Sequence, residues 1–392
     1  MTTALRAWSR RSAAAAGMAA ALLAGGSTPA LAALSQAPAP SFQTDGTVHA
    51  MVRVGGVVYI AGSFLNVRPA GAPPDTNNTP RQFVAAFNES TGDLMQNWTV
   101  APNATVRSLA VSSTGKGIIL GGDFTTVNGK THKHLARVRA CLNPSAGTCG
   151  TGGAALAAWN AHTNGSVYAL TSAGSRVFVG GNFTTVNGVR HRSLGAVNLT
   201  SGAVVKWTAN ANGEVRALLK SPAGTRIFAG GTFTKIGQHN QSHLTVLKAS
   251  TAKILPWAQK PAFRVKALTL NSTDLFVAGA GRGGFIEAAG LTRGKLKWRA
   301  QADGNIIGLA VSRSLLIATG HFRLFGSKHF NRIHLAAVSA ATGKVDQSWV
   351  ADENEVLGGF SVLGSRDHVW AGGDFTKIAG VDQQGFAQFN WQ

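Results

Sequence analysis

The chain has 392 residues, of which 44% are hydrophobic and 14% charged, and its formal net charge is +21 at pH 7. This hydrophobic content excludes an intrinsically disordered chain, which would lack the apolar residues for a core. The excess of 37 Lys and Arg over 16 Asp and Glu predicts adhesion to polyanions.

The first 32 residues have the features of a cleavable signal peptide. Three arginines precede an apolar stretch at residues 13–23, and the small-x-small sequence Ala30-Leu31-Ala32 follows. The stretch is shorter than the roughly 20 residues that span a bilayer, so we expect cleavage before Ala33 and no transmembrane segment. The pair Arg10-Arg11 leaves both the general secretory route and the twin-arginine route open.

Beyond this leader, one sequence unit recurs seven times. Each copy has an apolar run, a pair of small residues, a polar residue and usually Phe, as in residues 119–124. The first small residues lie about 40 to 60 positions apart, which is the length of whole supersecondary units: Ala61, Gly121, Gly180, Gly230, Gly279, Thr319 and Gly372. An aromatic residue also recurs once per copy: Phe42, Trp98, Trp159, Trp207, Trp257, Trp298 and Trp349.

Each unit is predicted to form four short strands. In one copy, apolar runs at residues 167–170 and 176–179 make a hairpin, and runs at 194–197 and 203–207 follow after a polar loop. The turns are rich in Gly and Asn, and no helical periodicity is sustained. The sequence therefore predicts an all-β fold, a seven-bladed β-propeller of four-stranded antiparallel blades.

The two ends of the chain predict how the ring closes. The last copy stops after its third strand at residues 386–390, and the segment from Leu34 to Phe42 takes the place of a fourth strand. We expect this N-terminal strand to complete the last blade, so that residues 33–392 form a single domain without an open edge. Pro38 and Pro40 fit only an outermost strand, because proline donates no ladder hydrogen bond.

The loop motif resembles that of a known family. Residues 121–129 read GGDFTTVNG, and similar copies begin at Gly180, Gly230 and Gly372. This pattern resembles the delta-60-repeat β-propeller family of secreted bacterial proteins over essentially all residues after the leader. The fifth copy departs from it, because residues 279–284 run into Phe285 without the Phe-Thr-x-x-Asn-Gly loop. The resemblance implies a propeller fold and export, and it implies no general activity.

Cys141 and Cys149 are the only cysteines of the chain. In an exported protein they are predicted to form a disulfide, within an insertion between the third and fourth strands of the second copy. The loop they close is short, so the bond should stiffen a hairpin rather than hold the fold. Two cysteines are too few for a structural zinc site, and no cofactor motif is present.

One alignment position concentrates polar side chains. The residue after the one that opens the first strand is, in successive copies, His49, Arg107, Tyr168, Arg216, Lys266, Ile307 and Leu357. Innermost strands would place this position at one mouth of a central channel, so we predict that the first five bind a ligand. A second alignment position, three residues before the one that opens the strand, is mostly Asp or Asn and is called the Asx column below: Asp45, Asn103, Asn164, Asn212, Ala262, Asp303 and Glu353. We favour turn formation over ligand binding for these residues.

Signals of catalysis are weak in this sequence. No nucleophile elbow occurs, and the acidic cluster Asp352-Glu353-x-Glu355 is interpreted as a solvated turn rather than a glycosidase pair. The histidines that recur at one repeat position, His134, His243 and His334, are interpreted as structural, because blades would spread them around the ring.

The sequence thus favours a secreted, monomeric, non-enzymatic binding or structural protein without metal or cofactor. Its predicted partner is an anionic wall polymer or polysaccharide, since removal of the leader arginines still leaves a net charge of about +18. No motif indicates sequence-specific nucleic-acid binding. Two alternatives stay open: a polysaccharide hydrolase or lyase with its site at the channel mouth, and positive charge that serves only solubility.

Overall fold

The computed structural model describes residues 33–392 except 143, 145–147, 150–152, 154–157 and 355–356, so the expected signal peptide lies outside the described residues. Within residues 34–392, every regular element described is a β-strand, which confirms the all-β prediction. No described segment forms a helix with the length and apolar character needed to cross a membrane.

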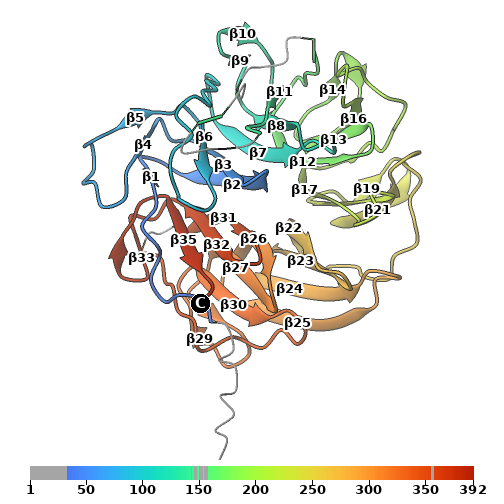
Figure 1. Cartoon of the computed structure of the whole chain (residues 1–392). Helices are drawn as coiled ribbons and strands as arrows, with labels where there is room; N and C mark the ends of the chain where they lie inside the picture. The colour runs from blue at the N-terminus through green and yellow to red at the C-terminus, as the bar shows by residue number, and fades with distance from the viewer. Residues whose placement is uncertain (1–32, 143, 145–147, 150–152, 154–157, 355–356) are drawn as a thin grey trace, which may run out of the picture. The chain divides into compact units, whose positions relative to one another are not determined.

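Seven sheets of the described chain share one antiparallel pattern of a first, a second and a third strand (Figure 1). The first strands are β2 (Val48–Val54), β7 (Val106–Val111), β12 (Val167–Ala173), β17 (Val215–Lys220), β22 (Arg264–Leu270), β26 (Asn305–Ser312) and β31 (Gly359–Gly364). The second strands are β3 (Val57–Gly62), β8 (Gly117–Gly122), β13 (Arg176–Gly181), β18 (Arg226–Gly231), β23 (Asp274–Gly281), β27 (Leu315–His321) and β32 (His368–Gly373). The third strands are β6 (Val84–Asn88), β11 (Leu135–Arg139), β16 (Leu194–Asn198), β21 (Leu244–Lys248), β24 (Gly283–Gly290), β30 (Leu335–Ser339) and β35 (Phe386–Asn390).

The first strands of successive sheets lie side by side. β2 packs against β7, and the same contact is repeated along the series β7, β12, β17, β22, β26 and β31. β31 in turn packs against β2, so the first strands of the first and the last copy are also neighbours. All side chains of β3 and β8 are buried, because the second strands lie between two strands of their own sheet and against neighbouring sheets.

A short two-stranded hairpin follows the second strand in six of the seven described copies. These hairpins are β4 (Asn66–Arg68) with β5 (Thr79–Pro80), β9 (Thr126–Val127) with β10 (Lys130–Thr131), β14 (Thr185–Val186) with β15 (Val189–Arg190), β19 (Lys235–Ile236) with β20 (His239–Asn240), β28 (Leu324–Phe325) with β29 (Phe330–Asn331), and β33 (Lys377–Ile378) with β34 (Val381–Asp382). β1 (Gln43–Thr44) pairs with β4. In the fifth copy, β23 turns directly into β24 around Arg282, where the sequence lacks the loop motif.

In most of the described sheets the fourth position is shorter than predicted. Only β25 (Leu296–Ala302) is a full fourth strand among the described residues, and it pairs along β24. Elsewhere the described fourth segment makes single antiparallel bridges, such as Phe87 with Leu94 and Val338 with Val345. The N-terminal segment behaves in the same way and bridges Leu34 to Trp391 and Ala39 to Gln388. Prolines in that segment lack the N–H that a continuous ladder requires.

Five of the repeated tryptophans make a hydrogen bond that joins neighbouring repeat copies. The indole Nε1 of Trp98 donates to the carbonyl of Arg139, at the end of a third strand of the following sheet, over 3.0 Å. Trp159, Trp207 and Trp298 repeat this bond over 3.1 Å each, and Trp349 makes it to Ser35 over 2.9 Å. Buried aromatic rings with one satisfied polar atom suit such inter-sheet positions.

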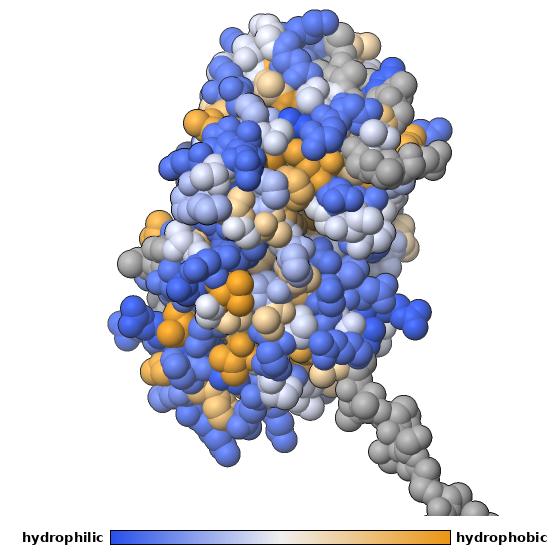
Figure 2. All heavy atoms as spheres, turned by 60° about the vertical axis from the view of Figure 1, so that its left-hand side comes forward, coloured by the Kyte–Doolittle hydropathy of each residue, from blue (hydrophilic) through white to orange (hydrophobic). Residues whose placement is uncertain are grey.

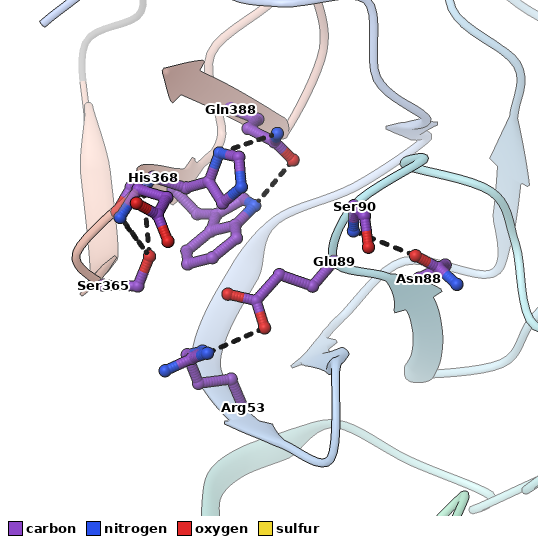
Figure 3. Close-up of polar contacts among 9 residues, drawn as sticks. Arg53, Asn88, Glu89, Ser90, Ser365, His368 and Gln388 are labelled. Carbon is purple, nitrogen blue, oxygen red and sulfur yellow. Dashed lines mark hydrogen bonds and ion pairs between the residues drawn. The ribbon is translucent and has the colours of Figure 1, made fainter. Parts of the chain in front are cut away.

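Polar contacts also fix the edges of the first and last sheets (Figure 3). Gln388 on β35 accepts a 2.9 Å bond from the indole of Trp370, and its Nε2 lies 3.3 Å from Nδ1 of His368. Arg53 near the end of β2 forms a 2.9 Å ion pair with Glu89, the residue that follows β6. Because both charged side chains are partly exposed to solvent, this pair contributes little to stability.

The predicted disulfide between Cys141 and Cys149 is confirmed. Both cysteines are buried, and the backbone N–H of Cys141 donates to the hydroxyl of Tyr59 on β3 over 2.8 Å. Burial raises the pKa of Tyr59 to about 12, so this hydroxyl stays protonated at neutral pH. The bridged insertion of the second copy is therefore anchored on the first sheet.

Candidate functional site

The five residues predicted to bind a ligand line one cavity. This cavity of about 260 Å³, called the ring cavity below, is lined by His49, Arg107, Tyr168, Arg216, Lys266, Ile307 and Phe360. Each residue comes from the first strand of a different sheet, so the cavity lies where these strands meet. The seventh residue is Phe360 and not Leu357 as aligned, because β31 begins only at Gly359.

A β-bulge aims each of these side chains into the ring cavity. The pairing of β2 with β3 skips one residue between Val48 and Ala50, and the skipped residue is His49. The same skip occurs in the other six sheets, at Arg107, Tyr168, Arg216, Lys266, Ile307 and Phe360. A bulge leaves its extra residue outside the ladder and redirects its side chain, which is why bulges are frequent near binding sites.

The small residue pair of the repeat makes room for this bulge. A Cβ on Gly62 would lie 1.9 Å from the carbonyl oxygen of Thr47, and one on Gly122 would lie 2.3 Å from that of Thr105. Only glycine fits this close approach of two backbones. In the fifth copy the equivalent position is Gly279, which pairs with Val265. The pair there is thus Ala278-Gly279, one residue earlier than the sequence alignment placed it.

Two acidic residues partly neutralise the cations of the ring cavity. Arg107 donates from Nε to Oδ2 of Asp123 over 2.7 Å, and Arg216 donates from Nε to Oε2 of Glu214 over 2.8 Å. Burial opposes ionisation of Asp123, but hydrogen bonds from Arg107 and Ser166 outweigh it and hold the pKa of this carboxyl below its ordinary value. Both arginines are thus compensated, and the mouth is less basic than the sequence predicted.

Tyr168 and Lys266 complete the charged half of the cavity. The Tyr168 ring lies between the two guanidinium groups, 4.3 Å from Cζ of Arg216 and 5.8 Å from that of Arg107, in cation–π geometry. Lys266 makes no hydrogen bond or ion pair with any described residue. Burial, and then the positive charge of Arg216, lower its pKa. An anion bound beside Lys266 would raise this pKa again, because opposite charge favours the ammonium form.

His49 belongs to the apolar half. Its ring packs edge-on against Phe360, with centroids 5.2 Å apart. Burial, and then Arg107, lower the pKa of His49 to about 4, so the imidazole is neutral at pH 7. A second hollow of about 220 Å³ adjoins the ring cavity and is lined by the following residues of the same strands, among them Met51, Leu109 and Leu170. The charged residues of the ring cavity thus lie beside a second hollow whose lining includes both polar and apolar side chains.

The Asx column has a structural role that differs from the predicted turn. Oδ1 of Asn103 accepts from the backbone N–H groups of Thr125 and Thr126 over 2.8 and 3.0 Å, at the start of hairpin β9–β10. Five other copies repeat this double bond, with Asp45, Asn164, Asn212, Asp303 and Asn354 as acceptors. These side chains therefore hold distant hairpins rather than their own turns. In the seventh copy the residue is Asn354, not Glu353.

The backbone of the repeat histidines has a structural role in each of their copies. His134, His243 and His334 have positive φ angles of 64°, 65° and 66°. Each N–H donates to the carbonyl of the Phe that opens the hairpin of its copy, Phe124, Phe233 and Phe322. This bond returns the chain to the third strand.

The acidic cluster at residues 352–355 is not a solvated turn. Glu353 is 2% exposed, and neither carboxylate oxygen has a hydrogen-bond partner among the described residues. Burial, and then the charges of Asp374 and Asp352, raise the pKa of Glu353 well above its ordinary value. Glu355 lies outside the described residues. The sequence analysis did not predict this burial, because several acidic residues close together usually mark an exposed turn.

We expect Glu353→Gln to stabilise the protein at pH 7 by about 1–2 kcal/mol and to have little effect near pH 4. A carboxyl with a raised pKa in the native state binds its proton more tightly there than in the unfolded chain. The contribution of Glu353 to the free energy of unfolding is therefore fully present below the pKa of an unfolded glutamate, about 4.3. It is lost as the pH rises toward the raised pKa of the native state. Urea unfolding at both pH values measures this difference, with the ion-paired Glu89→Gln as control. An equal effect of Glu353→Gln at both pH values would contradict it.

Comparisons with known proteins agree with this architecture. Residues 117–140, which hold β8 to β11, match a family described as a domain of unknown function (DUF5122) beta-propeller. The WD40 beta propeller domain of Doa1 is similar in structure, with a TM-score of 0.56 and 12% identity over 90% of this chain and 96% of that chain. The fold is a β-propeller.

A designed protein has the same likeness to this propeller. The computationally designed Ika8 protein gives a TM-score of 0.54 at 11% identity, over 91% of this chain and all of that chain. No curated protein sequence matches the propeller. At such identities the likeness concerns the fold alone, so the function has to be argued from the ring cavity.

Proposed function

We propose that the seven sheets form a closed, seven-bladed propeller of the delta-60-repeat kind, exported as a monomer, that binds an anionic extracellular polymer without catalysing a reaction. The contact of β31 with β2 supports closure. The bridges of Leu34 to Trp391 and of Ala39 to Gln388 on β35 support it as well, with the N-terminal segment as the outermost part of the last blade. The leader and the disulfide support export.

The convergence of Arg107, Arg216, Lys266 and Tyr168 in one cavity carries the binding proposal. Guanidinium and ammonium groups beside a tyrosine hydroxyl recognise carboxylate, sulfate or phosphate groups. Lys266 supplies the uncompensated charge, and Nη1 of either arginine makes no hydrogen bond with described residues. An anion would therefore find donors that the protein itself leaves free.

Hydrolysis of a polysaccharide is less well supported. A glycosidase needs one carboxylic acid that is protonated at working pH and a second that is ionised. Asp123 has a lowered pKa and is bonded to Arg107, and Glu214 is bonded to Arg216. Both carboxylates thus serve to orient cations.

The proposal is tested by the variant Arg107→Gln/Arg216→Gln/Lys266→Gln, with long-chain polyphosphate as the probe. A matched control is Arg53→Gln/Lys377→Gln/Lys130→Gln, which also removes two acid-paired cations and one unpaired cation. Fluorescence anisotropy across a salt series should show that the affinity for polyphosphate falls at least about tenfold in the first variant, called the ring variant, and not in the control. Equal losses in both variants would mean that positive charge acts diffusely over the surface.

A further inference from the structure

The missing hairpin of the fifth copy opens a path to the ring cavity. In the six other described copies, a hairpin stands after the second strand, on the side where the bulged residues lie. In the fifth copy the ladder runs from Gly281 to Gly283 with only Arg282 between them. The Asx residue that would anchor a hairpin is replaced by the exposed Ala262. Loop and anchor are therefore both absent from this one copy.

Adjoining cavities occupy this place. A cavity of about 780 Å³ shares Arg216 and Lys266 with the ring cavity and extends to Arg264 and Arg282. It shares Gly281 and Asn305 with a further cavity of about 360 Å³, which reaches Arg323. We call the two cavities together the fifth-sheet groove.

The fifth-sheet groove is basic, and three of its arginines form no ion pair with described residues. Arg264, Arg282 and Arg323 are exposed, and none of the three guanidinium groups bonds to another described residue. Two acidic residues line the groove, and both are engaged. Glu214 pairs with Arg216, and Oδ1 of Asp303 accepts from the N–H groups of Arg323 and Leu324.

We propose that the anionic ligand is a linear chain that lies along the fifth-sheet groove and ends in the ring cavity. This inference rests on the proposed binding function and adds the ligand's shape: a flexible polymer with regularly spaced anionic groups, rather than a compact anion. A compact anion would fill the ring cavity of about 260 Å³ and would leave Arg264 and Arg282 without a partner. A linear polyanion neutralises the cations of the ring cavity and of the groove at once. Its affinity rises because the two sets of anionic groups belong to one molecule.

The test compares tripolyphosphate with long-chain polyphosphate on intact mature protein. The affinity, expressed per phosphate group, should be higher for long-chain polyphosphate than for tripolyphosphate. Arg264→Gln/Arg282→Gln should weaken long-chain binding about tenfold, lower its salt slope by about 1–2, and leave tripolyphosphate binding unchanged. The matched control is Lys130→Gln/Arg190→Gln, which removes two exposed charges from the intact hairpins β9–β10 and β14–β15.

The outcomes separate this inference from the proposed function. Loss of binding in the ring variant with no effect of Arg264→Gln/Arg282→Gln would overturn the groove and keep the ring site. Equal losses in the groove variant and its control would also overturn the groove, as would equal affinity per phosphate for the two probes. If neither the ring nor the groove variant differs from its control, both proposals fail.

Discussion

Deletion of residues 33–42 is expected to remove a large part of the stability of the mature protein. Leu34 is 4% exposed and packs in the cluster of Trp349 and Phe389. The N–H groups of Ser35 and Ala39 donate to β35 over 2.8 and 2.7 Å, and the carbonyl of Ser35 accepts from Trp349. Burial of one leucine contributes about 1.5–3 kcal/mol and each of the three bonds about 1 kcal/mol, so the deletion removes a large part of a stability of about 5–15 kcal/mol.

Thermal unfolding and light scattering measure this effect. The truncated protein also exposes the edge of β35, so aggregation should accompany the lower melting temperature. A synthetic peptide of residues 33–42 added in trans should restore part of the stability, and the same peptide with Leu34→Asp should not. Melting of the truncated protein at the temperature of the mature protein would show that the N-terminal segment does not close the last sheet.

The repeat made much of this molecule predictable from sequence. Apolar runs and small pairs at regular spacing located the strands, and one alignment position located six of the seven residues of the ring cavity. The errors at Leu357 and Gly279 both arose where a copy departs from the consensus. In the seventh copy Gly359 replaces the usual valine, so the alignment lost its marker. Local pattern alone could not restore the register, which strand pairing sets.

Other features depend on contacts between residues distant in sequence. The pairing of Arg107 with Asp123 joins β7 to the residue that follows β8, and the burial of Glu353 depends on neighbouring elements. The Asx residues bond amides about twenty positions away, so a local turn rule assigned them the wrong partner. The β-bulges were equally hidden, because a skipped residue leaves no compositional mark. The recurring glycine that each bulge requires could be found in the sequence, but the close backbone approach that requires it could not.

Trp207→Ala should destabilise the protein by about 3–5 kcal/mol, the usual cost of removing a fully buried aromatic ring. Trp207 is 0% exposed, and its ring packs edge-on against Phe178 with centroids 4.9 Å apart. Its Nε1 donates to the carbonyl of Lys248 in the next sheet over 3.1 Å. The substitution therefore leaves a cavity between two sheets and removes a bond that joins them. Urea denaturation measures the change in the free energy of unfolding.

The phenylalanine variants separate packing from the hydrogen bond. Trp257 occupies the same repeat position, but its buried Nε1 has no partner among the described residues, and its ring lies over Gly294. Trp207→Phe loses both ring volume and a bond worth about 1 kcal/mol, whereas Trp257→Phe loses volume and relieves an unsatisfied donor. Trp207→Phe should therefore cost more than Trp257→Phe. If the two substitutions cost the same, the repeated indole bond does not stabilise the junction between sheets, and packing alone explains why tryptophan recurs.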